Sequence, residues 1–291
     1  MNIGWIGTGI MGASMATHLL GAGHPLFVFN RTRSKAEPLL KSGGFWCGSP
    51  AEVAAKAEIV FTIVGHPRDV EEVYLGSDGV LSEKGPCRIV VDMTTSRPSL
   101  AQVIAERASL LGIESLDAPV SGGDAGARSG TLAIMAGGKR AVFEEVLPLF
   151  RLMGKNISLM GGAGAGQHTK MCNQILVAGT MIGICESLLY AVKLGLDQMA
   201  VFDIVAKGLA GSNLLNVFGP RIAQGDFEPG FFVEHFIKDM GIALAETEAV
   251  GLSLPGLALV HQLYVAAKAQ GRSRSGTQAL YLALKSINGM G

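Results

Sequence analysis

The chain has 291 residues, of which 48% are apolar and only 16% are charged, and its formal net charge is zero. Without an excess of positive charge, nucleic acid and acidic membrane surfaces are poor candidate partners, and the length suits one large or two ordinary domains. The four cysteines show no CxxC spacing and the first predicted strand begins at Asn2, leaving no room for a signal peptide, so we expect a cytoplasmic protein with reduced thiols.

A glycine-rich motif follows that first strand directly. It reads GTGIMG, and an apolar run at helical spacing begins within it. In this setting Gly7 permits a tight turn, Gly9 lets the backbone approach a pyrophosphate, and Gly12 lets helix and strand pack closely. The free N–H groups at the start of the helix suit phosphates. We expect a dinucleotide here, with glycines that serve only the turn as the alternative. The residues expected to bind it are Gly7, Thr8, Gly9, Ile10, Met11 and Gly12.

The second predicted strand, Pro25 to Phe29, ends in Asn30, Arg31 and Thr32. Dinucleotide sites selective for NAD usually carry Asp or Glu at this point, to accept a hydrogen bond from the ribose 2′-hydroxyl. An arginine suits a 2′-phosphate instead, because its planar fork bonds phosphate and stacks on adenine. We therefore predict that NADP(H) is the cofactor; an ordinary solvated arginine is the alternative.

Strand-like and helical runs then alternate as far as Met160, which predicts an α/β fold with a doubly wound Rossmann sheet, parallel in its first part. The further strands expected are Ile59–Val64, Ile89–Asp92, Glu114–Asp117, Thr131–Ala136 and Asn156–Leu159. The helices expected are Ser34–Ser42, Pro50–Lys56, Pro67–Tyr74, Pro98–Leu111 and Arg140–Met153. Ligands bind beyond the carboxyl ends of such strands. The loops expected to face the cofactor are Gly65–Pro67, Thr94–Ser96 and Ala118–Asp124.

The last of these loops has the composition of an anion site. Ser121 supplies a hydroxyl, and Gly122 and Gly123 leave their backbone N–H groups unobstructed. Together they form a small nest suited to a carboxylate. A flexible glycine loop is the alternative.

After Met160 the strand pattern stops, and GGAGAG, from Gly161 to Gly166, is expected to be a hinge. We predict an NADP-binding Rossmann domain over residues 1–162 and an all-helical substrate and oligomerisation domain over residues 163–291. The apolar second half also predicts a homodimer or homotetramer held by the helical domain. Its further helices are expected at Gln198–Ala206, Leu214–Gln224, Val233–Ala249, Pro255–Gln270 and Gly276–Ile287.

A long interdomain helix is predicted from Gly164 to Leu196. It contains no proline and carries no formal charge from Met171 to Cys185, so we expect it to be buried on most sides. Lys170 lies in its first turns, with Asn173 one turn further on, which makes this pair a catalytic candidate. A core helix whose lysine extends outward to solvent, or a membrane span, are the alternatives.

Two other groups of polar side chains could hold a metal or reach the cofactor. His168 and His235 are too isolated to predict a metal site, and we expect none. Lys238 and Asp239 lie on one turn of a predicted helix, where the lysine reaches the cofactor or the two form a solvated pair.

Six motifs, in order along essentially the whole chain, resemble one enzyme family: WIGTGIMGASMA, FNRT, DMTTSRP, DAPVSGGDAGARSGTLAIMAGG, GAGQHTKMCNQ and FIKDMGIALA. The chain is similar to the β-hydroxyacid dehydrogenases, which include 3-hydroxyisobutyrate dehydrogenase and the tartronate, glyoxylate and succinic semialdehyde reductases. The resemblance implies Lys170, Asn173 and Ser121 as catalytic residues. It implies Ser121, Gly122, Gly123, Asn173 and Gln174 as substrate-binding residues. Beside the glycine-rich motif, it implies Asn30, Arg31, Thr32, Val64, Thr95 and Lys238 as cofactor-binding residues.

Three positions depart from the family pattern. Gln174 stands where many members have a second asparagine, and Val64-Gly65-His66 stands where the loop often reads Leu-Pro-Asp. The acidic residue of NAD-using members is absent after the second strand.

The resemblance implies NADPH-dependent, reversible reduction of a small carboxylate-bearing aldehyde to the hydroxyacid. Hydride delivered to an aldehyde carbon leaves an alkoxide, which a nearby lysine protonates as general acid. Two alternatives stay open: an enzyme of the 3-hydroxyisobutyrate type that works mainly in the oxidative direction, and an NADPH-binding regulatory protein of the same fold without turnover.

Overall fold

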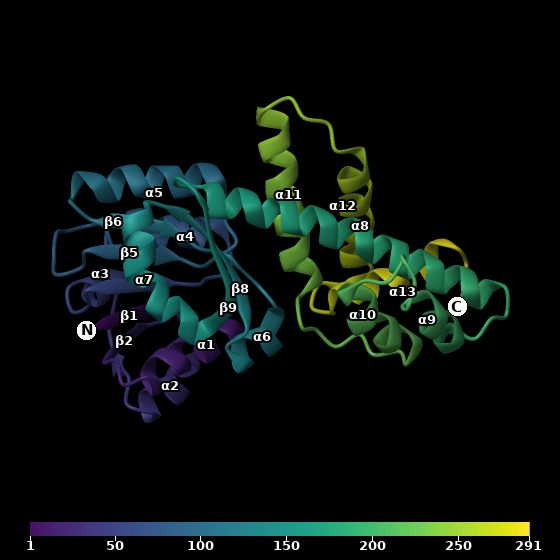
Figure 1. Ribbon diagram of the computed structural model, residues 1–291, viewed down its shortest axis with the longest axis horizontal. Helices are drawn as coiled ribbons and strands as arrows, with labels where there is room; N and C mark the ends of the chain where they lie inside the picture. Colours follow the sequence, from purple (N-terminus) through teal and green to yellow (C-terminus); the bar gives the residue numbers. More distant parts are fainter. Residues whose placement is uncertain (291) are drawn as a thin grey trace. The chain divides into compact units, whose positions relative to one another are not determined.

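The computed structural model describes residues 1–290, and the chain folds as two compact units (Figure 1). The first unit extends from Met1 to Lys170 and the second begins at Met171. An open, mostly parallel sheet with helices on both faces forms the first unit, and helices alone form the second. The predicted fold class, a Rossmann domain followed by a helical domain, is confirmed.

Nine strands form the sheet of the first unit, in the order β3-β2-β1-β4-β5-β6-β8-β7, with β9 paired to β8. The strands from β3 to β6 are all parallel to their neighbours, whereas β8 runs antiparallel to β6 and β7. Their bounds are β1 (Ile3–Ile6), β2 (Leu26–Phe29), β3 (Phe45–Trp46), β4 (Ile59–Thr62), β5 (Ile89–Asp92), β6 (Glu114–Asp117), β7 (Val120–Ser121), β8 (Leu132–Gly138) and β9 (Gly154–Gly161).

The helices of this unit begin at residues that suit a helix start. Proline lies at the first or second position of four of them, where its missing N–H costs nothing. The predicted helix over Ser34–Ser42 is instead a 3₁₀ turn, η1 (Arg33–Lys35), followed by a short helix. That short helix is α2 (Glu37–Lys41). The other helices are α1 (Ile10–Gly21), α3 (Pro50–Ala54), α4 (Pro67–Leu75), α5 (Pro98–Leu110), α6 (Gly123–Ser129) and α7 (Arg140–Met153).

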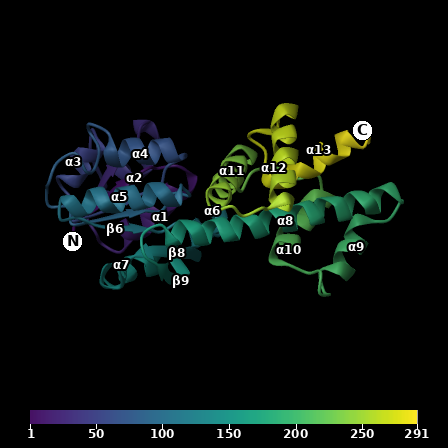
Figure 2. The same ribbon diagram turned by 90° about the horizontal axis from the view of Figure 1, so that it is seen from above.

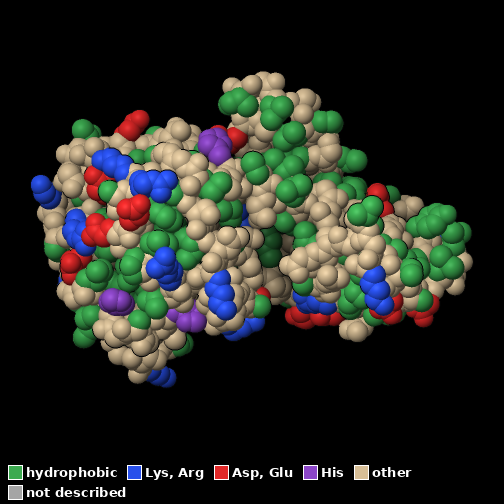
Figure 3. Space-filling view, in the orientation of Figure 1, with side chains coloured by type: hydrophobic (Ala, Val, Ile, Leu, Met, Phe, Trp, Pro, Cys, Tyr) green, Lys and Arg blue, Asp and Glu red, His purple; other side chains and the backbone are tan. Residues whose placement is uncertain are grey.

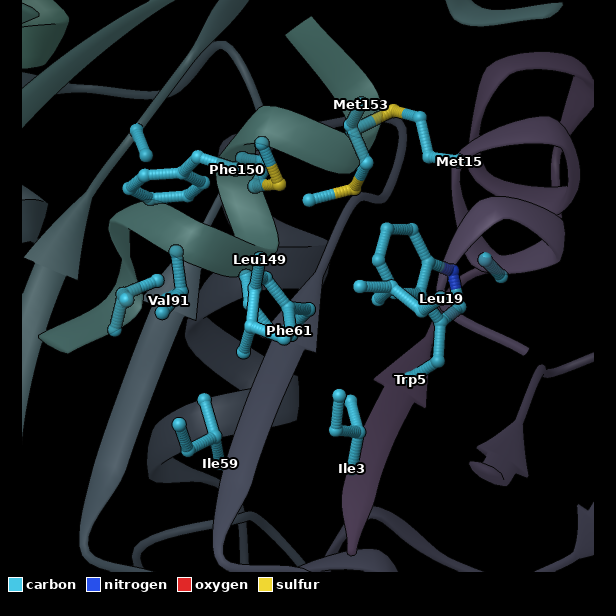
Figure 4. Close-up of a cluster of buried hydrophobic side chains, with 14 of the residues drawn as sticks. Ile3, Trp5, Met15, Leu19, Ile59, Phe61, Val91, Leu149, Phe150 and Met153 are labelled. Atoms are coloured by element: carbon cyan, nitrogen blue, oxygen red, sulfur yellow. The ribbon is translucent and has the colours of Figure 1, made fainter. Parts of the chain in front are cut away.

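Alternate residues of the central strands pack against opposite faces of the sheet. On one face Trp5 and Phe61 pack with Leu19 of α1 and Phe150 of α7, as Figure 4 shows. On the other face the residues next to them, such as Val60, pack against α3, α4 and α5. Strands buried on both faces in this way read as continuous apolar runs, which is why the sequence pattern located them.

The second unit consists of helices around a core of its own. Phe236, Met240 and Tyr264 lie at its centre, and the Tyr264 hydroxyl donates to the Thr277 carbonyl oxygen at 2.8 Å. The regular part of the predicted helix over Pro255–Gln270 ends at Ala267, and the residues after it form an irregular turn, Lys268–Arg272, in which Gly271 has a left-handed φ of 80°. The helices are α9 (Gln198–Val205), α10 (Asn213–Ala223), α11 (Val233–Ala249), α12 (Pro255–Ala267), η2 (Lys268–Arg272), η3 (Thr277–Ala279) and α13 (Leu280–Ile287).

The long helix α8 (Ala165–Lys193) begins in the first unit and continues into the second (Figure 2). Its length agrees with the prediction, but the expected burial on most sides is wrong for the single chain, since Leu176 is 69% and Tyr190 67% exposed. By length and composition alone, α8 is long and apolar enough to cross a membrane, and 39% of its most apolar stretch is buried. The core helix of a soluble protein has the same properties, so they are weak evidence for a membrane.

Candidate functional site

The glycine-rich turn between β1 and α1 has the shape that a dinucleotide site requires. Gly7 has a φ of 98°, and a Cβ there would collide with the Ile63 carbonyl oxygen. A Cβ on Gly12 would collide with the Gly7 carbonyl oxygen, whereas one on Gly9 would meet no atom within 4 Å. There is therefore open space beside Gly9, which caps α1, and the first turn of α1 holds no acidic side chain. These residues fit a pyrophosphate.

Asn30 and Arg31 have different surroundings at the end of β2. The Asn30 Oδ1 accepts from the Thr8 N–H at 2.9 Å, and its Nδ2 donates to the Thr32 carbonyl oxygen at 2.8 Å. Asn30 thus ties the glycine-rich turn to the loop after β2. The Arg31 side chain is 81% exposed and donates to the Asp69 Oδ1 at 3.2 Å. Sequence reasoning missed this carboxylate beside Arg31, because Asp69 lies in the first turn of α4.

The loops after β4 and β5 are joined by hydrogen bonds. The Val64 N–H donates to the Thr94 Oγ1 at 3.0 Å, and the Thr94 N–H donates to the Asp92 Oδ1 at 3.0 Å. Thr95 follows and is half-buried. Two of the predicted cofactor residues, Val64 and Thr95, therefore belong to adjoining loops at the carboxyl edge of the sheet.

The first turns of α8 are bound to the end of β6 by one buried carboxylate. Asp117 accepts from the Gly164 N–H at 2.7 Å and from the Gln167 N–H at 2.8 Å. Burial raises the pKa of this carboxyl, although the backbone N–H groups that bind it act in the opposite direction. A Cβ on Gly166 would collide with the Met135 carbonyl oxygen, so the helix lies directly against the sheet. Asp117 thus caps α8 and places the residues that follow.

Lys170 points inward from the end of this anchored segment. It is 7% exposed, and its Nζ donates to the carbonyl oxygen of Val120 in β7 at 2.9 Å. The alternative of a lysine that extends outward to solvent is therefore wrong. Since Ser121 follows Val120 directly, the structure brings the predicted catalytic lysine to the predicted carboxylate loop, within the first unit.

That loop is more ordered than the flexible alternative supposes. Ser121 ends β7, Gly122 caps α6 with a φ of 132°, and Gly123 begins α6 with a φ of 63°. A Cβ on Gly123 would meet no atom within 4 Å, so the space beside it is open. A glycine is favoured at this position by the positive φ alone. Asp124, next along α6, pairs with Arg128 at 2.7 Å.

In the second unit, a buried carboxylate holds two of the other candidates. Asp239 is 1% exposed and accepts from the Gln174 Nε2 at 2.7 Å, with the Lys238 Nζ 3.1 Å away. The Lys238 side chain is only 14% exposed, so the solvated-pair alternative is wrong. Asn173 is half-buried on α8, within one helical turn of Lys170. Across residues 1–290, no group of three or more His, Cys, Asp and Glu side chains is placed to hold a metal ion.

Comparisons with known proteins bear on both units. Residues 2–162 match the family described as the NAD-binding domain of 6-phosphogluconate dehydrogenase. Residues 164–284 match the family described as NAD-binding of NADP-dependent 3-hydroxyisobutyrate dehydrogenase.

Individual relatives cover nearly the whole chain. A probable mitochondrial 3-hydroxyisobutyrate dehydrogenase-like protein of Arabidopsis thaliana is 51% identical, over 98% of this chain and 86% of its own. The 2-hydroxy-3-oxopropionate reductase of Escherichia coli is 41% identical, over 98% of this chain and 97% of its own. Among solved structures, the 3-hydroxyisobutyrate dehydrogenase of Mycobacterium tuberculosis with L-serine has a TM-score of 0.88 and 30% identity, and covers 98% of this chain and 99% of its own.

Proposed function

The chain belongs to the β-hydroxyacid dehydrogenase family, and we propose that it reduces a small carboxylate-bearing aldehyde, of the semialdehyde or glyoxylate type, with NADPH. It is an oxidoreductase with a nicotinamide cofactor. The substrate class, the preference for NADPH and the catalytic residues are proposed below. The observation that carries it is the 2.9 Å hydrogen bond from the Lys170 Nζ to Val120, which holds a buried ammonium beside Ser121.

The substrate carboxylate binds at the end of β7. Ser121 offers a hydroxyl there, and Gly122 and Gly123 offer backbone N–H groups, with open space beside Gly123. Groups of this kind bind an anion without a cationic side chain. The relative from Escherichia coli is named for such a substrate, because 2-hydroxy-3-oxopropionate carries an aldehyde and a carboxylate. Asn173, one turn after Lys170, orients the substrate.

Lys170 acts on the aldehyde oxygen. Bound NADPH supplies the hydride. The Lys170 ammonium polarises the carbonyl beforehand and donates its proton to the oxygen as negative charge develops there. In the oxidative direction the neutral amine takes the same proton from the hydroxyacid. Burial keeps bulk water away from the ammonium, which strengthens its interaction with the developing charge.

Arg31 is the residue that favours NADPH over NADH. Its Nη1 donates to Asp69, and the other N–H groups of an 81% exposed guanidinium remain for a 2′-phosphate. The glycine-rich turn, Val64 and Thr95 complete the proposed cofactor site within the first unit. We also propose residues 1–162 as the cofactor domain and residues 163–291 as the helical domain, in a cytoplasmic homodimer or homotetramer.

A screen of NADPH oxidation tests the proposal. Glyoxylate and the succinic, methylmalonic and tartronic semialdehydes are the substrates, and neutral aldehydes of the same size are the controls. We expect turnover of at least one acid and much slower turnover of its neutral counterpart. NADPH binding without turnover of any substrate, in either direction, would favour the regulatory alternative instead.

A further inference from the structure

The side chain of Gln167 bridges the loop after β5, Thr94–Ser96, which is called the cofactor loop because it is expected to face the cofactor. It is fully buried at 0% exposure. Its Oε1 accepts from the Ser96 N–H at 2.9 Å, and its Nε2 donates to the Thr94 carbonyl oxygen at 2.7 Å. The two backbone groups that it holds lie on either side of Thr95. A carboxamide offers a donor and an acceptor side by side and stays uncharged across the ordinary pH range, so glutamine suits this bridge.

The same residue is part of the helix that carries Lys170. Gln167 precedes Lys170 by three positions in α8, so the two lie within one turn and toward the same side of the helix. Its own N–H is held by Asp117 at 2.8 Å. Gln167 therefore cannot shift along the sheet without breaking the cap of α8. All of these contacts lie within the first unit.

The cofactor loop is thus held from two directions. From the sheet, Asp92 accepts from the Thr94 N–H, and the Thr94 hydroxyl accepts from Val64. From α8, Gln167 holds the atoms that flank Thr95. The first set fixes the loop to the strands, and the second fixes it to the helix of the proton donor.

We propose that Gln167 is a positioning residue that sets Thr95 and Lys170 relative to one another. This inference rests on the proposed function, in which Thr95 contacts the cofactor and Lys170 donates the proton. Hydride and proton reach neighbouring atoms of one carbonyl group, so the two partners must be placed together. A displacement of about 1 Å between reacting groups costs on the order of 100-fold in rate.

Two substitutions at this position test the inference. Gln167→Met keeps the length of the side chain and removes both hydrogen bonds. We expect kcat to fall by about 10- to 100-fold, with the Kd for NADPH and the KM for the substrate within about threefold of wild type. Gln262→Met, at an exposed position of α12, is the matched control and is expected to behave as wild type.

Gln167→Glu supplies a readout that a merely structural role does not move. When protonated, the introduced carboxyl accepts from Ser96 and donates to Thr94, as the carboxamide does. When ionised it has no proton to donate and its charge faces the Thr94 carbonyl oxygen. The ratio of variant kcat to wild-type kcat is therefore expected to rise as the pH falls through the pKa of the new carboxyl. Asp117, Asp92 and Lys170 are the titratable groups around it, and the ratio divides out the part of their pH dependence that both proteins share.

The outcomes separate the inference from the proposed function. If wild type turns over and Gln167→Met retains more than about half of its kcat, the inference is wrong. It is equally wrong if Gln167→Glu, which decides the matter should Gln167→Met not fold, gives a ratio that is flat with pH. Wild type without turnover of any substrate would instead overturn the proposed function, and the inference with it.

Discussion

At the scale of single residues, the chemistry depends on what a buried lysine binds. An ammonium taken out of water is costly unless hydrogen bonds replace the lost hydration. Lys170 donates to the carbonyl oxygen of Val120, the first residue of β7, and the loop of Ser121 and Gly122 follows directly. The arrangement keeps a proton donor beside an anion site.

Ser121→Ala tests the anion site at this scale. Loss of the hydroxyl is expected to raise KM for carboxylate-bearing aldehydes, by roughly 10- to 100-fold for one neutral-to-charged hydrogen bond, while NADPH binding stays unchanged. Ser129→Ala, at the far end of α6, is the control. Steady-state kinetics with an acid and a neutral aldehyde measure the effect. A rise in KM that is the same for the acid and for the neutral aldehyde would show that Ser121 does not bind the carboxylate.

Arg31→Ala tests the cofactor preference. The variant is expected to weaken NADPH binding by about 1.5–3 kcal/mol, the scale of a charged hydrogen bond, and to leave NADH binding nearly unchanged. Fluorescence titration with both cofactors measures it, and Arg140→Ala, another exposed arginine next to a carboxylate, is the control. Equal losses for the two cofactors would contradict a role for Arg31 at the 2′-phosphate.

Several of these residues were predictable from the sequence and some were not. Gly7, Ser121 and Lys170 each lie in a short motif at the end of a predicted strand or at the start of a predicted helix. Their place in the fold could therefore be predicted from the sequence. Asp69, Asp117 and Gln167 act through partners 38, 47 to 50 and 71 to 73 positions away. No local pattern signals such contacts, because the fold alone brings these residues together.

At the scale of elements, length decided what could be predicted. The four-residue parallel strands and the 29-residue α8 were predicted, and the structure contains them close to their expected bounds. β3 and β7 have two residues each, too few for a period to appear. α6 contains two glycines and a serine, which favour a loop in isolation, and it forms where Ala127 packs into the core.

The position of Lys170 depends on the capped start of α8. Asp117→Asn keeps the shape but offers one acceptor oxygen where two N–H groups point, so one of them loses its partner. We expect a loss of about 1–3 kcal/mol in the free energy of unfolding at about pH 7. Glu106→Gln, on the exposed face of α5, is the control in urea denaturation. An Asp117→Asn variant as stable as wild type would contradict the capping role.

The pH dependence of that effect has a definite sign. Burial raises the pKa of Asp117 in the folded state above its ordinary value, so the folded protein binds the proton more tightly than the unfolded chain. The contribution of this carboxyl to stability therefore grows as the pH falls through the raised pKa and is smaller at neutral pH. The gap between wild type and Asp117→Asn should widen from about pH 7 to about pH 4.5.

At the scale of the whole molecule, the helical unit exposes several large apolar side chains, and exposed apolar surface is typical of protein–protein contacts. Leu176, Tyr190 and Ile204 are each more than two-thirds exposed. Figure 3 shows hydrophobic side chains spread over this unit on the face in view. We predict a homodimer or homotetramer in which other copies of the chain cover this surface.

Light scattering measures the oligomeric state directly. At micromolar concentration the expected mass is two or four times that of one chain. Replacing Leu176 and Tyr190 together by serine should shift the protein toward the monomer, whereas the same change at exposed Val103 and Leu110 of α5 should not. A wild-type protein that is monomeric under these conditions would contradict the prediction.

The most direct test of the account is the proton donor. Lys170→Met keeps an unbranched apolar chain in the same space and removes the ammonium; Lys193→Met, exposed at the end of α8, is its control. The variant is first shown to be folded and to bind NADPH as tightly as wild type. Its single-turnover reduction of the substrate from the screen should then be slower by about 10²- to 10⁴-fold. If Lys170→Met retained more than about a tenth of the wild-type rate, the proton would come from elsewhere and the central claim would be wrong.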